Sequence, residues 1–123
     1  MSQSDQDATS AAELFDLLWE SLADVLGTAA TATLVRRALK QVASQAPGSE
    51  PVIVTRNGLE YEYRVPETWK QPGNVEAIDA LRVVAAELRV LLVELTGTVV
   101  VARLARLAAF RKSGIDFNDE APT

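Results

Sequence analysis

The sequence repeats part of itself at a distance of seventy residues. The segment Leu17–Leu39 aligns with Glu87–Ala109 without a gap, and eight of the 23 aligned pairs are identical. Both copies carry a Gly-Thr pair at the same step, at residues 27–28 and 97–98, between apolar stretches that favour helix. A repeated helix–break–helix pattern predicts two helical hairpins, related by a pseudo-two-fold axis.

The first helical hairpin is predicted over residues 10–46. Ser10 and Glu13 fit a capping box, in which each side chain satisfies the backbone amide of the other residue. Gly27 suits the end of this first helix, and Thr28 is placed to cap the second helix. The first helix carries an acidic stripe opposite its apolar face, formed by Glu13, Asp16, Glu20 and Asp24. We expect this stripe to be a solvated surface rather than a cation site.

Residues 51–65 have the alternating pattern of a β-hairpin around Asn57-Gly58. Asn-Gly favours a type I′ turn, so we expect a two-residue loop that places Thr55 opposite Glu60. In that register one face is apolar and should pack on the helices. Its members are Val52, Val54, Leu59, Tyr61, Tyr63 and Val65.

The second helical hairpin is predicted over residues 74–113. Residues 66–74 are expected to form a loop, after which Asn74 caps a long helix, 75–95, and a fourth helix runs to about Lys112. The expected chain is a single domain at 10–114, flanked by a disordered tail at 1–9 and an acidic tail at 115–123. Its fold class is α+β, mainly α, with the central β-hairpin packed on the two helical hairpins.

The third predicted helix has two apolar faces. The broad face should lie in the core: Leu81, Val84, Leu88, Leu91, Leu92 and Leu95. The second face is a narrow stripe: Val83, Ala86, Val90 and Val93. Arg82 and Arg89 separate the two faces on one side, and Glu87 and Glu94 separate them on the other. A helix with two apolar faces needs two partners, so we predict that the narrow stripe is a homodimer interface; the alternative is a central helix buried on both faces.

Composition removes several function classes. The chain has no cysteine and no histidine, which excludes thiolate and imidazole catalysis and removes the usual ligands of transition metals and haem. We therefore expect no metal site and no cofactor. A net charge of −5 disfavours nucleic acid and acidic membrane surfaces as partners. The helix–helix–hairpin order is also that of a winged helix, but Glu60 and Glu62 make the wing acidic. The polar N-terminus and the charges within residues 83–107 predict a cytoplasmic protein rather than a secreted or membrane-spanning one.

Two further residue sets are candidates for binding. Trp69 in its proline-bracketed loop, with Arg36, Arg37 and Arg106, is the predicted contact for a protein partner. The plainer alternatives are that Trp69 covers the edge of the core and that the arginines pair with the acidic stripe. A small-molecule sensor or carrier would instead need an apolar pocket between the helical hairpins, lined by Phe15, Trp19, Leu22, Leu88 and Leu92. A small enzyme lacking histidine and cysteine is the remaining alternative, although no catalytic motif is present.

The repeated pattern of a leucine-rich helix, a Gly-Thr break and an alanine-rich helix with arginines spans residues 22–39 and 88–107. It resembles small helical output or adaptor domains of prokaryotic signal transduction. The resemblance implies a role in prokaryotic signalling. Together with the two apolar faces and the candidate contact residues, it leads us to expect a cytoplasmic, non-enzymatic module that self-associates and binds another protein.

Overall fold

The computed structural model describes residues 9–45, 52–107, 110, 112 and 115. In these residues the order of elements is α2 (Ala11–Leu26), α3 (Thr28–Gln45), β1 (Ile53–Asn57), β2 (Glu60–Arg64), the short 3-10 helix η1 (Glu67–Lys70), α4 (Val75–Thr96) and α5 (Val99–Ala105). The fold is α+β and mainly α, which confirms the predicted class. Most of the predicted N-terminal tail, the expected end of the first helical hairpin at residue 46 and residues 116–123 of the predicted acidic tail lie outside the described residues.

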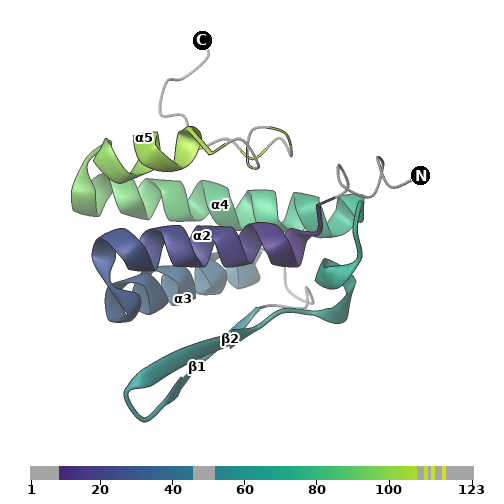
Figure 1. Cartoon of the computed structure of the whole chain (residues 1–123), viewed down its shortest axis with the longest axis horizontal. Helices are drawn as coiled ribbons and strands as arrows, with labels where there is room; N and C mark the ends of the chain where they lie inside the picture. Colours follow the sequence, from purple (N-terminus) through teal and green to yellow (C-terminus); the bar gives the residue numbers. More distant parts are fainter. Residues whose placement is uncertain (1–8, 46–51, 108–109, 111, 113–114, 116–123) are drawn as a thin grey trace.

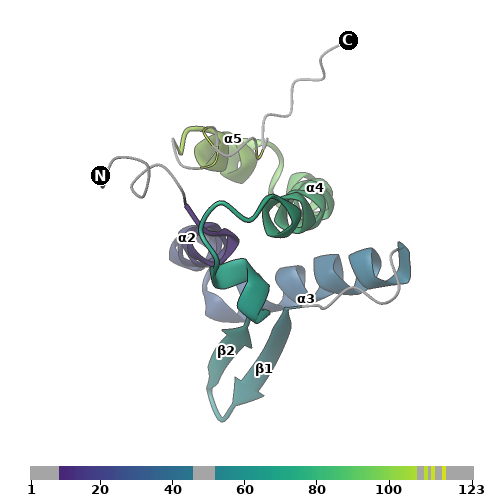
Figure 2. The same cartoon turned by 90° about the vertical axis from the view of Figure 1, so that its right-hand side faces the viewer.

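Four helices surround one core, and the β-hairpin lies against them on one side (Figure 1). Figure 2 shows α2, α4 and α5 nearly end-on, with α5 above and α3 below, whereas α3 lies across the view. The helix α3 therefore crosses the other three at a steep angle. The hairpin extends downward beside α3, and its tip points away from the helices.

The core is built from the apolar faces of all four helices. Its largest fully buried side chains are Phe15, Phe110, Leu14, Leu18, Leu22, Leu81, Leu88, Leu92, Leu104, Val35 and Val101. On α4 the broad face was predicted correctly for Leu81, Val84, Leu88 and Leu92, but Leu95 is exposed at the end of the helix. Leu95 lies in the last turn of α4, one residue before the helix ends at Thr96.

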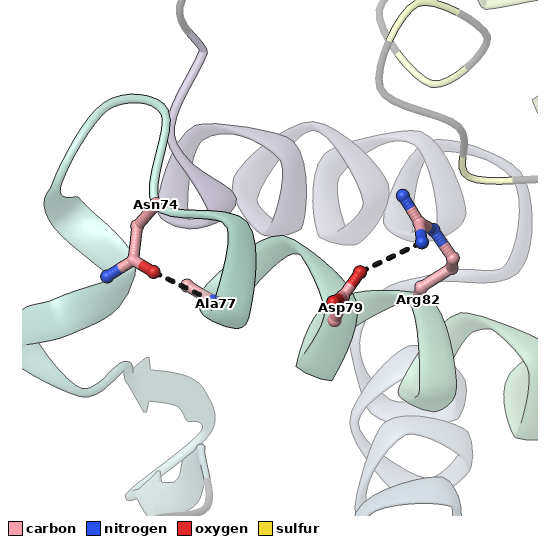
Figure 3. Close-up of polar contacts among 4 residues, drawn as sticks. All are labelled: Asn74, Ala77, Asp79 and Arg82. Carbon is pink, nitrogen blue, oxygen red and sulfur yellow. Dashed lines mark hydrogen bonds and ion pairs between the residues drawn. The ribbon is translucent and has the colours of Figure 1, made fainter.

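The predicted starts of α2 and α4 are confirmed. At α2 the Ser10 amide donates to Glu13 Oε1 (3.2 Å) and the Glu13 amide donates to Ser10 Oγ (3.1 Å), which forms the expected capping box. At α4 the Asn74 carboxamide oxygen accepts from the Ala77 amide (3.2 Å; Figure 3). Each cap satisfies an amide that the first turn of a helix leaves without a partner.

Gly27 and Gly97 occupy equivalent positions at the ends of α2 and α4. Both have positive φ, 90° and 72°, and each amide donates to the carbonyl four residues earlier, at Ala23 and Val93. The following helices differ, because α3 has 18 residues and α5 has seven, and α3 alone lies across the view of Figure 2. The pseudo-two-fold relation between the two helical hairpins therefore stays a prediction. Thr28 is the first residue of α3 and not its N-cap, which corrects the expected boundary.

The β-hairpin forms, but its predicted register is wrong. Asn57 pairs with Glu60 and Thr55 pairs with Glu62, so Gly58 and Leu59 make the turn. Asn57 does not have the positive φ that a type I′ turn at Asn57-Gly58 requires, whereas Gly58 does (67°). A shift of two residues keeps every side chain on its face, so the inward set remains as predicted except for Leu59, which is 91% exposed at the tip.

Two further boundaries differ from expectation. The predicted loop 66–74 contains η1. The helix α5 ends at Ala105, after which the Arg106 and Leu107 amides donate to the carbonyls three residues earlier. Ile115, which was assigned to the tail, is buried in the core, and its amide donates to the Phe110 carbonyl (2.9 Å). Apolar contacts of Phe110 and Ile115 thus continue the core beyond the last described turn of α5.

Candidate functional site

The narrow stripe of α4 lies on the outside of the fold. Val83 is 46% and Val90 is 49% exposed, Ala86 is exposed, and Val93 is half-buried. On a helix with 100° per residue, this stripe points almost opposite to the buried Leu81, Leu88 and Leu92. In Figure 2, α2 lies on one side of α4, and no described helix or strand lies on the opposite side. Within the described chain, Val83, Ala86 and Val90 therefore face away from the core, whereas Val93 packs against its edge.

Charged side chains border the stripe of α4 on both edges. Arg82 donates to the Asp79 carboxylate one turn earlier (2.8 Å; Figure 3), and both side chains remain about half exposed. Arg89 follows one heptad later on the same edge and is half-buried. On the other edge, Glu87 is half-buried and Glu94 is exposed. An apolar row between two charged rows is typical of a helix that pairs with another helix.

A second candidate surface is a groove between α3 and β1. Its basic wall is the exposed row Arg36, Arg37 and Lys40 of α3, and its apolar floor includes Leu39 and Val52. The hollow has a volume of about 370 Å³. Within the described residues β1 pairs only with β2, so backbone groups along its other edge are without a strand partner. The sequence contains the arginines, but only the docked hairpin places β1 beside them.

Arg106 is not part of this basic groove. Its side chain lines a different hollow with Val99, Ala102 and Arg103 of α5. Figure 2 shows α5 and α3 on opposite sides of the layer formed by α2 and α4. The structure therefore does not bring Arg106 together with Arg36 and Arg37. The expected pairing between arginines and the acidic stripe occurs between Arg103 and Asp24, at 3.8 Å and with both side chains largely exposed.

Trp69 is buried and is not the exposed contact that was expected. It is 5% exposed and its ring meets that of Phe15 edge-on at a centroid distance of 6.1 Å. Phe15 also contacts the Tyr63 ring at 4.8 Å, and Trp19 contacts it at 4.9 Å. The alternative interpretation fits, because Trp69 closes the edge of an aromatic cluster that joins α2, β2 and η1.

The hydroxyl of Tyr63 links this cluster to the acidic face of α2. It donates a hydrogen bond to the Asp16 carboxylate. Burial raises the pKa of Tyr63 well above its ordinary value, and the bond to Asp16 and the negative charges of Asp16 and Glu20 raise it further. The acidic stripe was otherwise predicted correctly as an exposed face, but the role of Asp16 in docking the hairpin has no signal in the sequence.

The five residues suggested for an apolar pocket form part of the core instead. Phe15, Leu22, Leu88 and Leu92 are fully buried, and Trp19 is 7% exposed. None of these five side chains lines the hollow between α3 and β1, the hollow beside the β-hairpin or the hollow on α5. Among the described residues, no cluster of three or more carboxylates is arranged to hold a metal ion.

Comparison with protein-family models, with curated proteins and with solved structures found no significant match for this chain. The surfaces of the chain itself are therefore the basis for its function. The described helices include none with the length and apolar character needed to cross a membrane.

Proposed function

We propose that this chain is a non-enzymatic, self-associating adaptor or regulatory module of cytoplasmic signalling that binds another protein. The observation that carries the proposal is the apolar stripe of α4, Val83, Ala86, Val90 and Val93, which is largely exposed on the side of the helix turned away from the core. Apolar side chains in a helical row, bordered by charges, are typical of an interface with another helix. A second copy of the same stripe is the simplest surface that matches it.

The exposed valines indicate the strength of this association. Burying the exposed halves of Val83 and Val90 on both copies contributes roughly 3 kcal/mol. Association costs at least several kcal/mol in lost translational and rotational freedom. The valines alone do not offset that cost, so the bordering side chains have to contribute, and we expect a weak dimer that forms only at high protein concentration.

The groove between α3 and β1 supports the second part of the proposal, the binding of another protein. Arg36, Arg37 and Lys40 form a basic row on a chain whose net charge is −5, so they are a local site for an acidic segment. An extended segment is able to pair with the outer edge of β1 while its carboxylates face these side chains. The resemblance to adaptor domains of signal transduction favours the same function, and the packed core at the suggested pocket favours it over a carrier.

Sedimentation velocity of the wild-type chain and of Val90→Asp tests the self-association. A charge at the centre of the stripe should shift the protein to the monomer, with an unchanged far-ultraviolet circular dichroism spectrum, because Val90 does not contribute to the core. Leu59→Asp is the matched control, since Leu59 is also an exposed apolar residue but lies at the hairpin tip. If folded Val90→Asp retains the hydrodynamic size of the wild type, the stripe is not the interface.

A further inference from the structure

We propose that two copies of the chain pair through α4 in parallel and in register, and that Arg82 and Arg89 of each copy face Glu87 and Glu94 of the other. The inference rests on the proposed self-association and adds to it the orientation of the partner. It follows from the order of residues around α4 and from which of them are exposed.

The exposed side of α4 has the heptad order of a two-stranded coiled coil. Val83 and Val90 take the a positions, and Ala86 and Val93 take the d positions. β-Branched residues at a favour two strands, and the small Ala86 allows the two helices to approach closely. In the same frame Arg82 and Arg89 are at g, and Glu87 and Glu94 are at e.

Symmetry decides which edges meet. If the two-fold axis runs along the helices, the helices are parallel, and the arginine edge of one copy lies against the glutamate edge of the other. If the axis lies across the helices, they are antiparallel, and each edge meets the same edge of the second copy. The antiparallel arrangement places arginine against arginine and glutamate against glutamate, and these contacts are repulsive.

The spacing along the helix also fits the parallel arrangement. In a parallel coiled coil, a residue at g faces the e residue five positions later on the partner helix. Arg82 and Glu87 are five positions apart, and so are Arg89 and Glu94. Symmetry doubles these two contacts to four in the dimer. Two heptads are few for an isolated coiled coil, but α4 is already folded by its core face and has no nucleation cost to offset.

The local contact of Arg82 is compatible with this pairing. Arg82 bonds Asp79 of its own helix at 2.8 Å, yet its side chain is 48% exposed. The half-exposed guanidinium is able to accept contact from a second carboxylate while it keeps its bond to Asp79 (Figure 3).

Charge reversal of one edge distinguishes the two orientations. In the parallel dimer, Arg82→Glu/Arg89→Glu converts four attractive contacts into four repulsive ones, so the dissociation constant should rise at least ~10-fold. In an antiparallel dimer the same variant replaces one repulsive edge with another, and the constant should stay within about twofold. Arg64→Glu/Lys70→Glu is the matched control, because it makes the same change in net charge on exposed side chains of β2 and η1, away from the stripe.

Spin labels at the two ends of α4 give the orientation directly, because the chain has no native cysteine. Single variants Val75→Cys and Leu95→Cys would be labelled in turn. In the parallel dimer both sites give short distances, since the helix axes lie about 10 Å apart. In any antiparallel dimer, at least one of the two sites gives a long distance. The sites are twenty positions apart, and a rise of 1.5 Å per residue then requires an axial separation between the two labels of at least about 30 Å at one site.

The proposed self-association and the proposed parallel pairing are tested separately. If Val90→Asp stays dimeric, the stripe is not the interface, and both proposals fall. If Val90→Asp is monomeric while the arginine variant dimerises normally or one labelled site gives the long distance, self-association through the stripe stands and the parallel pairing is wrong.

Discussion

Replacing Phe15 with alanine should loosen the hairpin and η1 from the helices. Phe15 is fully buried, and its ring contacts those of Tyr63 on β2 and Trp69 on η1. A two-stranded hairpin is marginal in water by itself. The arrangement beside α3 therefore depends on this cluster, and so does the groove proposed for an acidic partner.

The size of the effect follows from burial. Truncating a fully buried phenylalanine to alanine costs about 3–5 kcal/mol, through lost transfer free energy and the cavity that remains. Two edge-on ring contacts place Phe15 toward the upper part of that range. Since domains have free energies of unfolding of roughly 5–15 kcal/mol, the variant should lose a large fraction of its stability. The expected fall in Tm is on the order of 15 °C.

Urea unfolding followed by tryptophan fluorescence is the assay, because both tryptophans of the chain, Trp19 and Trp69, lie in this cluster. All variants are compared at one protein concentration, since self-association adds to apparent stability. Leu59→Ala at the exposed tip is the control and should change the free energy of unfolding by less than about 0.5 kcal/mol. A loss below about 1 kcal/mol for Phe15→Ala would refute the view that this cluster holds the hairpin in place.

Two further substitutions test the local contacts. Tyr63→Phe should lower the free energy of unfolding by about 1 kcal/mol at pH 7, because the bond to Asp16 is lost. Since the pKa of Tyr63 is raised in the folded state, its hydroxyl stabilises the fold fully below pH ~10 and progressively less above it. The difference in free energy of unfolding between wild type and Tyr63→Phe, measured in urea titrations, should therefore shrink above that pH. A constant difference would contradict the assignment. Asn74→Ala should cost about 1 kcal/mol through loss of the cap on α4, whereas Asn74→Asp should retain most of the stability; equal losses in thermal unfolding would exclude capping as the cause.

Local sequence signals predicted the helices well. The Ser10–Glu13 capping box, the Asn74 cap and the glycines at the ends of α2 and α4 each act within a few residues, so their chemistry is visible in the sequence. Apolar periodicity likewise separated the core face of α4 from its exposed stripe. The hairpin faces were recovered because a shift of two residues preserves alternation, although the Asn-Gly signal gave the wrong turn.

Features that depend on packing between distant segments were not predictable. Trp69 was proposed as an exposed partner contact, with cover of the core edge as the alternative, and its burial involves a contact with Phe15 across 54 positions of sequence. The separation of Arg106 from Arg36 results from the steep crossing of α3, which no periodicity encodes. The groove between α3 and β1 likewise exists because the hairpin docks there, through Tyr63 and its bond to Asp16.

Native mass spectrometry of the untagged wild-type chain, at a concentration of about 50 μM, separates a dimer from a monomer by mass and is therefore the most direct measurement of self-association through α4. We expect a predominant species of twice the 13.3 kDa chain mass, with no additional bound molecule. A spectrum that contains only the 13.3 kDa monomer would contradict self-association through α4.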